Sequence, residues 1–156
     1  MSSSMNHRIA FVQSSWHEAI VDRCRVSFAD EVAELGVAPS GVDFYKVTGA
    51  FELPFYAKRL ALTGRYSAVV AAGLVVDGGI YRHEFVAEAV ISGLMRVQLD
   101  VDVPVISAVL TPHHFHEHEQ HLAFFSEHFE VKGREAAKAC TETINSLAGL
   151  SSAVVA

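Results

Sequence analysis

The sequence has 156 residues, of which 51% are hydrophobic and 19% charged, and its formal net charge is −6. A chain of this length can bury a substantial core, and its composition excludes a disordered protein. The acidic balance and the lack of a Lys/Arg block exclude nucleic acid as the expected partner.

Neither a membrane segment nor a disulfide framework is expected. The first residues, MSSSMNHR, lack a hydrophobic signal segment, and no apolar run reaches the roughly 18 residues of a membrane span. Cys24 and Cys140 lie in helix-like sequence without metal-ligand spacing, which predicts two buried thiols in a reducing compartment. We therefore expect a cytoplasmic protein with no membrane partner, forming one domain over 1–156 with flexible ends at 1–7 and 150–156.

The first half of the chain alternates between strand and helix patterns. IAFVQS (9–14) is continuously apolar, which is typical of a strand covered on both faces of a parallel sheet. An amphipathic helix is predicted over 16–35, where apolar residues recur at spacings of four. VDFYKV (42–47) predicts a second strand, and a short helix follows over 52–63.

The alternation continues through the second half. SAVVAAGLVV (67–76) and VPVISAVLT (103–111) predict two more doubly covered strands. Between them, residues 81–100 predict a helix that is apolar nearly all round, so it is either deeply buried or faces a partner subunit. Two C-terminal helices are predicted, over 113–128 and 132–148.

A break between those last helices is expected near Gly133. Four strands alternating with helices predict an α/β fold, namely an open doubly wound sandwich around a parallel sheet. Ligands of such sheets bind beyond the carboxyl ends of the strands. The expected ends are rich in small, aromatic or titratable residues: Ser14 to His17, Val47 to Glu52, Asp77 to Ile80, and Thr111 to His114.

Two of these strand ends carry candidate binding residues. Trp16, the only tryptophan, could stack on a flat heterocycle or could pack as a helix-start residue against the core or a neighbour. Glu52 could be a solvated acid favoured by a helix dipole, or it could accept hydrogen bonds from sugar-like hydroxyls. In the second reading the backbone of Ala50 and Phe51 would contact a ring edge.

The turn after the third strand combines glycines with charged side chains. Asp77-Gly78-Gly79 opens a helix, whose free N–H groups can bind an anion such as phosphate. Arg82 can pair with phosphate, and His83 can act as a general acid or base. The alternative is a surface Arg-His pair without a role.

Six of the nine histidines lie in PHHFHEHEQHLAFFSEHF (112–129). His114, His118 and His121 share one helical face, and paired histidines of this kind can ligate zinc. The His-Glu-x-x-His pattern of metalloproteases is absent, however, and we expect no metal. A pH-sensitive interface helix or a phosphate-facing row is the favoured interpretation, and a His-rich metal-binding scaffold is the least favoured.

From about Arg8 to Ala148 the chain resembles the lumazine synthases. The motifs that carry this resemblance are TGAFELP (48–54), GLVVDGG (73–79), VPVISAVLT (103–111) and VKGREAA (131–137). The resemblance implies the lumazine synthase fold, a flavodoxin-like three-layer α/β sandwich with a four-stranded parallel sheet. It also implies a condensation without a cofactor. In it, the amino group of 5-amino-6-(D-ribitylamino)uracil attacks the ketone of 3,4-dihydroxy-2-butanone 4-phosphate, phosphate leaves, and 6,7-dimethyl-8-ribityllumazine forms.

The resemblance also implies roles for individual residues. Trp16 would stack on the pyrimidine, and Ser107 would face its other side, often in the site of a neighbouring subunit. The remaining substrate-binding positions are Ala50, Phe51 and Glu52 for the ring and ribityl chain, Leu74, Val75 and Val76 for the ring, and Gly79 and Ile80 for phosphate.

This chain departs from the family pattern at the catalytic and phosphate positions. The usual catalytic histidine aligns with Arg82, and His83 lies one residue, or about 100° of helix, further on. Ile80 replaces the usual threonine of the phosphate turn. The family's phosphate-binding arginine falls in the His-rich stretch, where His121 is the nearest match. We therefore expect Arg82 and His83 to be catalytic, and Arg82 and His121 to anchor phosphate.

A Trp after the first strand, Tyr-Arg-His and a His-rich helix together resemble the type II lumazine synthases. That resemblance implies a homo-oligomer, either a pentamer or a decamer of two pentamers. The helix over 81–100 suits the contact within a pentamer, and the His-rich stretch suits the seam between pentamers. The alternative function is a flavin- or lumazine-binding assembly with weak or lost catalysis.

Overall fold

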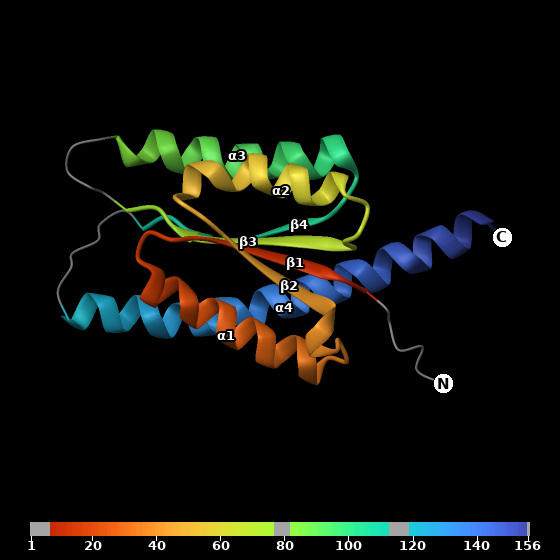
Figure 1. Cartoon of the computed structure of the whole chain (residues 1–156), viewed down its shortest axis with the longest axis horizontal. Helices are drawn as coiled ribbons and strands as arrows, with labels where there is room; N and C mark the ends of the chain where they lie inside the picture. The colour runs from red at the N-terminus through yellow and green to blue at the C-terminus, as the bar shows by residue number, and fades with distance from the viewer. Residues whose placement is uncertain (1–6, 77–81, 113–118, 156) are drawn as a thin grey trace.

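Within residues 7–76, 82–112 and 119–155, which the computed structural model describes, four strands form a parallel sheet (Figure 1). The strands are β1 (Ile9–Ser14), β2 (Val42–Val47), β3 (Ala68–Leu74) and β4 (Val105–Leu110). Their order is β2-β1-β3-β4, and every neighbouring pair runs parallel. All four apolar runs are therefore strands, and the predicted sheet is confirmed.

Burial along each strand follows from its place in the sheet. The central strands β1 and β3 are buried at every position, as expected for strands covered on both faces. The edge strand β2 instead alternates, with Val42 buried and Phe44 exposed over 43% of its surface. The predicted double-sided burial is wrong for 42–47 and for the other edge strand, β4, which is also only partly buried. The helices on the two faces cover these edge strands less completely than the central strands.

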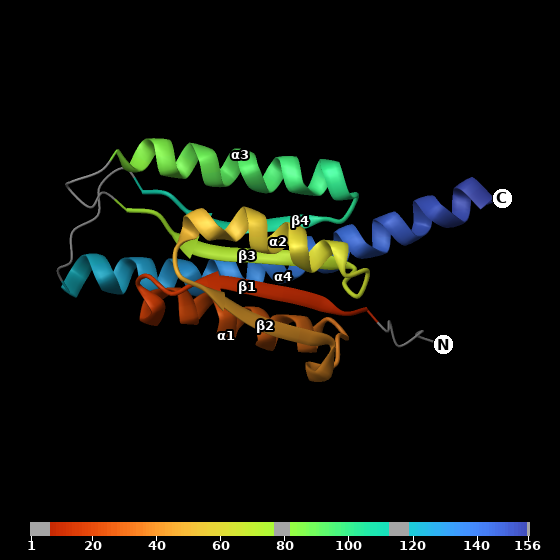
Figure 2. The ribbon, with the colours of Figure 1, turned by 45° about the horizontal axis from the view of Figure 1, so that its top comes forward.

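Helices cover both faces of the sheet, which confirms the predicted three-layer sandwich (Figures 1 and 2). In β1, Ile9 and Phe11 join the core on one face, and Ala10 and Val12 join the core on the other. The first core is closed by α1 (Glu18–Glu34) and α4 (Glu119–Val155), and the second by α2 (Leu53–Leu62) and α3 (His83–Val101). Short turns η1 (Pro39–Gly41) and η2 (Ala50–Glu52) flank β2.

The C-terminal region is one helix where two were predicted. α4 continues without a break through Gly133, which is buried where α4 packs on α1. A Cβ at this position would lie only 1.9 Å from Ser27 Oγ and 2.5 Å from the Cys24 carbonyl oxygen. The glycine therefore permits a close helix–helix contact, and it does not end the helix.

Both ends of the chain reach beyond the described residues. Residues 1–6 and 156 lie outside them, so the predicted flexibility of 1–7 and 150–156 stays a prediction, although α4 is helical to Val155. The last turns of α4 extend past the sheet in both views (Figures 1 and 2). None of the described helices combines the length and the apolar character of a membrane span.

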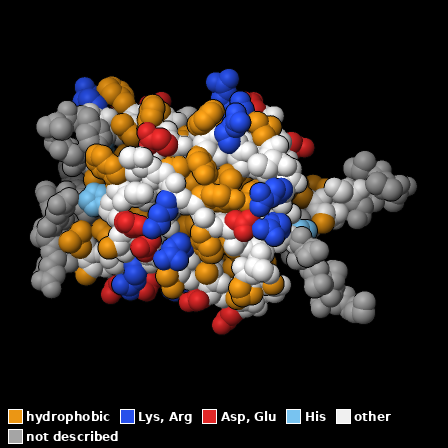
Figure 3. Space-filling view, viewed as in Figure 1, with side chains coloured by type: hydrophobic (Ala, Val, Ile, Leu, Met, Phe, Trp, Pro, Cys, Tyr) orange, Lys and Arg blue, Asp and Glu red, His pale blue; other side chains and the backbone are white. Residues whose placement is uncertain are grey.

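α3 is apolar on its outer side as well as on its inner side. Val90, Leu94 and Val97 are buried against the sheet. The opposite side exposes Phe85, Ile91, Met95 and Leu99, the last over 73% of its surface. Figure 3 shows hydrophobic side chains among charged ones on the outside of the layer that α2 and α3 form. Apolar surface of this extent is typical of a contact with another protein chain.

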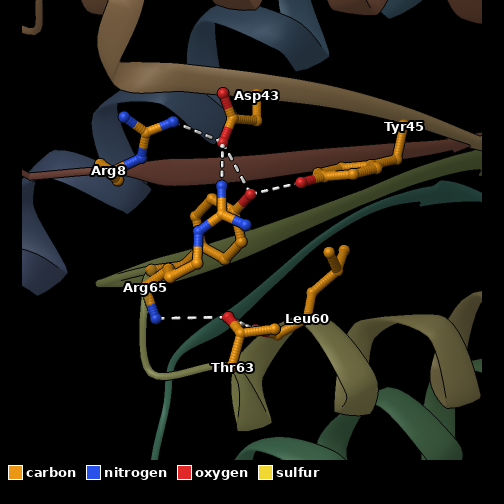
Figure 4. Close-up of polar contacts among 7 residues, drawn as sticks. Arg8, Asp43, Tyr45, Leu60, Thr63 and Arg65 are labelled. Atoms are coloured by element: carbon orange, nitrogen blue, oxygen red, sulfur yellow. Dashed lines mark hydrogen bonds and ion pairs between the residues drawn. The ribbon is translucent and has the colours of Figure 1, made fainter.

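A polar network closes the amino end of the sheet (Figure 4). Arg8 Nη2 and Tyr66 OH each donate a hydrogen bond to Asp43 Oδ2 at 2.7 Å, and Arg65 Nη2 lies 3.4 Å from the same oxygen. Tyr45 and Tyr66 share a further hydrogen bond between their hydroxyls. The hydrogen bond from Arg8 is the main reason that the pKa of Asp43 is lowered.

Replacing Asp43 with asparagine should therefore destabilise the fold in a pH-dependent way. Because the pKa of Asp43 is lowered in the fold, its stabilising charge acts fully above the unfolded value of about 4. It is lost as the pH falls through the lowered folded value. The free energy of unfolding, measured with denaturant at pH 7 and pH 3, should differ less between wild type and variant at pH 3. An equal difference at both pH values would contradict the prediction. Asp100→Asn, at an exposed position, serves as the control.

Candidate functional site

A crevice opens beyond the carboxyl ends of the adjacent strands β2, β1 and β3. Its volume is about 240 Å³. The lining residues are Trp16, Thr48, Gly49, Ala50, Phe51, Glu52, Leu74, Val75 and Val86. All of them except Thr48, Gly49 and Val86 were predicted as ligand-binding residues. The structure thus brings together residues that lie up to about seventy positions apart in the chain.

Trp16 forms one wall of the crevice, directly after β1. It is exposed over 58% of its surface, which excludes packing in the core of its own chain. The preceding residue, Ser15, ties the end of β1 to β2, because both its N–H and its hydroxyl donate to the Val47 carbonyl at 2.8 and 2.9 Å. His17, which follows Trp16, has a positive φ of 55° and is the N-cap residue of α1. Trp16 is therefore held between two fixed backbone positions.

Glu52 lines the crevice and also stabilises its own turn. The Gly49 N–H donates to Glu52 Oε2 at 2.9 Å, and the Glu52 N–H donates to the Gly49 carbonyl at 3.2 Å. Leu53, the next residue, is fully buried and anchors the start of α2. Each of the two alternatives for Glu52 is thus partly met: it is an acid at a helix start, and its carboxylate is exposed at a crevice.

The end of β3 provides the floor of the crevice. Leu74, Val75 and Val76 are all buried, and the first two line the crevice. The side chains of these residues belong to the two cores, and the Val75 N–H donates to the Leu110 carbonyl at 2.9 Å. Because these side chains are packed in the cores, a ligand can contact this segment through its backbone.

Arg82 and His83 lie at the start of α3, one helical turn before the lining residue Val86. Arg82 Nε donates to Glu84 Oε1 at 2.6 Å, and its guanidinium lies 4.7 Å from the centre of the Phe85 ring. His83 Nδ1 is 3.5 Å from Glu84 Oε2. The hydrogen bond from Arg82 is the main reason that the pKa of Glu84 is lowered. Glu84 therefore holds Arg82 through a hydrogen bond and lies beside the ring of His83.

Four predicted residues remain, and of these only Ser107 has a described side chain, which does not line the crevice. Gly79 and Ile80 lie in 77–81, outside the described residues. His121 falls in the first turn of α4, and Ser107 is exposed on the edge strand β4, where its Oγ accepts a hydrogen bond from the Val109 N–H at 3.3 Å. The predicted roles of all four residues stay predictions.

The described residues provide neither a cluster of metal ligands nor an exposed thiol. Within the described ranges, no three His, Cys, Asp or Glu side chains gather as a metal site would require, while His113 to His118 lie outside them. Cys24 and Cys140 are both buried, as predicted, and burial raises the pKa of each thiol to about 12. Neither thiol can supply a thiolate at neutral pH.

Four residues at the site have roles that sequence reasoning missed. Thr48 and Gly49 line the crevice and belong to the motif TGAFELP, so the motif itself was their signal. Val86 lies three residues after His83, a spacing that places neighbouring side chains on one helical face. Glu84 directly follows the predicted catalytic pair, but only the folded helix start shows that it contacts both residues.

Comparison with known proteins finds one family for nearly the whole chain. A family model described as 6,7-dimethyl-8-ribityllumazine synthase matches residues 6–148. A 6,7-dimethyl-8-ribityllumazine synthase of Rhodococcus erythropolis is 63% identical, over 96% of this chain and 97% of its own length. Two proteins named 6,7-dimethyl-8-ribityllumazine synthase 2 are 57% and 53% identical. They come from Pseudomonas syringae pv. tomato and Bradyrhizobium diazoefficiens, and the matches cover 95% and 96% of this chain and 87% and 89% of theirs.

Proposed function

The chain belongs to the 6,7-dimethyl-8-ribityllumazine synthase family, and we propose that the crevice beside Trp16 is where it binds its pyrimidine substrate. The enzyme condenses 5-amino-6-(D-ribitylamino)uracil with 3,4-dihydroxy-2-butanone 4-phosphate to 6,7-dimethyl-8-ribityllumazine, a step of riboflavin biosynthesis. An imine forms between the amino group and the ketone, phosphate leaves, and the ring closes with loss of water.

One observation supports the crevice above all. Trp16, the turn 50–52 and the end of β3 come from three different strand ends, yet they line a single crevice. The exposed indole offers a flat surface for the pyrimidine ring, and Glu52 offers an exposed carboxylate to the ribityl hydroxyls. The backbone of Leu74 to Val76 would contact the ring edge. Holding two substrates in reactive orientation would supply much of the rate acceleration.

The start of α3 would serve the second substrate. The Nε of Arg82 is bonded to Glu84, but the terminal nitrogens of the guanidinium can still pair with a phosphate. The imidazole of His83, half-buried beside the same carboxylate, would transfer protons during imine formation and ring closure. Gly79, Ile80 and His121 are proposed as further phosphate contacts.

Turnover tests this function directly. Mixing the two substrates with the purified chain should produce the fluorescence of the lumazine product. Binding of a ribityl-pyrimidine without any product would instead support a flavin- or lumazine-binding assembly. No structural observation favours that alternative.

Replacing Arg82 with alanine should raise the KM for the butanone phosphate by about tenfold or more. A hydrogen bond to a charged group contributes roughly 1.5–3 kcal/mol, and here it would be lost with the phosphate substrate only. Steady-state kinetics with each substrate varied in turn measures the effect, and Arg96→Ala, on the same helix but paired with Asp100, is the control. Equal losses for both substrates would contradict a phosphate role.

We further propose that the enzyme assembles as a pentamer or as a dimer of pentamers. The exposed apolar row Phe85, Ile91, Met95 and Leu99 would be covered by a neighbouring copy, and Ser107 would complete a neighbour's crevice. Replacing Leu99 with glutamate should lower the mass measured by light scattering, since it puts a charge into that contact. A wild-type mass of one chain would contradict the assembly.

The cellular location and the domain organisation are proposed on the same basis. The two cysteines are free and buried, which fits a reducing cytoplasm. Residues 1–156 would form a single lumazine synthase domain that needs no cofactor. Fractionation of cells that express the chain would test the location.

A further inference from the structure

Gly49 occupies a position where the backbone does not require glycine. Its φ of −135° and ψ of 174° lie in the extended region that any residue adopts. It precedes the turn η2, and it lines the crevice together with Glu52. The reason for a glycine here must therefore come from its surroundings.

Those surroundings consist of one group. A Cβ at position 49 would lie 3.1 Å from Glu52 Oε2, and apart from the two chain neighbours it would meet no other described atom within 4 Å. The same oxygen accepts the hydrogen bond of the Gly49 N–H at 2.9 Å. A side chain at this position would therefore press on the carboxylate and leave the rest of the fold untouched.

The two carboxylate oxygens of Glu52 differ in their hydrogen bonding. Oε2 is held by the Gly49 N–H, and the Glu52 N–H returns a bond to the Gly49 carbonyl at 3.2 Å. Within 7–76, 82–112 and 119–155, Oε1 accepts no hydrogen bond, and Glu52 is exposed where it lines the crevice. A carboxylate oxygen fixed in place in this way can accept hydrogen bonds from ligand hydroxyls.

We propose that Gly49 is a positioning residue for recognition of the ribityl chain. Its N–H fixes one carboxylate oxygen of Glu52, and its missing side chain leaves room for that carboxylate, so the other oxygen is presented to the polyol. This inference rests on the proposed function of the crevice. In this inference, Gly49 and Glu52 together determine the selectivity for a polyol substituent, and only Glu52 contacts the substrate.

The variant Gly49→Ala separates positioning from folding. The carboxylate must move by a few tenths of an ångström, which the flexible Glu52 side chain can do at little cost to stability. The affinity for a 5-nitro-6-(D-ribitylamino)uracil probe should fall by about tenfold, the scale of a weakened hydrogen bond to a charged group. The affinity for the matching 6-methylamino probe, which has no hydroxyls, should not change. Calorimetric titration of the assembled enzyme measures both constants.

Two controls make the result decisive. Gly149→Ala places a Cβ in open space on α4, so it should change neither affinity. On a Glu52→Ala background, Gly49→Ala should have no further effect on the ribityl probe, because the carboxylate it displaces is gone. An unchanged preference for the ribityl probe in Gly49→Ala would overturn the inference. A wild type without that preference would overturn the proposed function instead.

Discussion

Replacing Gly133 with alanine should lower the thermal unfolding midpoint of the protein by roughly 4–8 °C. The new Cβ would lie 1.9 Å from Ser27 Oγ and 2.5 Å from the Cys24 carbonyl, so α1 and α4 must move apart. Such overpacking costs about 1–3 kcal/mol, and a clash with backbone lies at the upper end of this range. The better helix propensity of alanine offsets up to about 1 kcal/mol, which leaves a net loss of about 2 kcal/mol.

The matched control for this change is Gly149→Ala on the same helix. Among the described residues, and apart from its chain neighbours and its own helix backbone, no atom lies within 4 Å of a Cβ built there. Only the helix propensity changes, so the midpoint should stay the same or rise. Thermal unfolding followed by circular dichroism compares the two variants. Equal shifts for both would show that Gly133 is not a contact position.

Replacing Trp16 with alanine should weaken binding of the pyrimidine substrate by about 1–3 kcal/mol, the scale of stacking a base on an aromatic side chain. This corresponds to a loss of affinity between roughly fivefold and 150-fold. Stability should hardly change, because 58% of the Trp16 surface is exposed. Trp16→Phe should retain most of the affinity, since a flat ring remains.

Titration of both variants with the nitro analogue of the substrate measures this loss. Phe124→Ala removes an aromatic ring that is also exposed, over 60% of its surface, but lies on α4 and does not line the crevice. It should leave the affinity unchanged. A Trp16→Ala variant that binds the analogue as tightly as wild type would remove the indole from the site.

The strands and most helices could be predicted because local sequence and global packing agree. Fully buried strands such as β1 and β3 give unbroken apolar runs, and amphipathic helices give a spacing of four. The prediction of a helix break at Gly133 failed. It rested on the low helix propensity of glycine, which is about 1 kcal/mol below that of alanine. The tight packing of α4 on α1 outweighs that preference, and only the three-dimensional contact shows it.

The candidate site was predictable to the extent that a motif or a strand end marks its residues. Trp16 and 50–52 follow strands directly, so the topology alone brings them to one edge of the sheet. The contacts of Gly49 with Glu52, and of Glu84 with Arg82 and His83, depend on hydrogen bonds a few ångströms long. The first contact has the three-residue spacing of a capping box, so that spacing could have indicated it. The contacts of Glu84 have no such sequence signal, because neighbouring residues at a helix start can adopt several side-chain arrangements.

The most direct measurement exploits the fact that Trp16 is the only tryptophan. If the pyrimidine stacks on this indole, 5-nitro-6-(D-ribitylamino)uracil should quench the tryptophan emission of the assembled enzyme to saturation, with one probe bound per chain. The dissociation constant from this quenching should equal the calorimetric value. Calorimetric binding that leaves the emission unchanged, or no binding at all, would contradict a substrate site in the crevice beside Trp16.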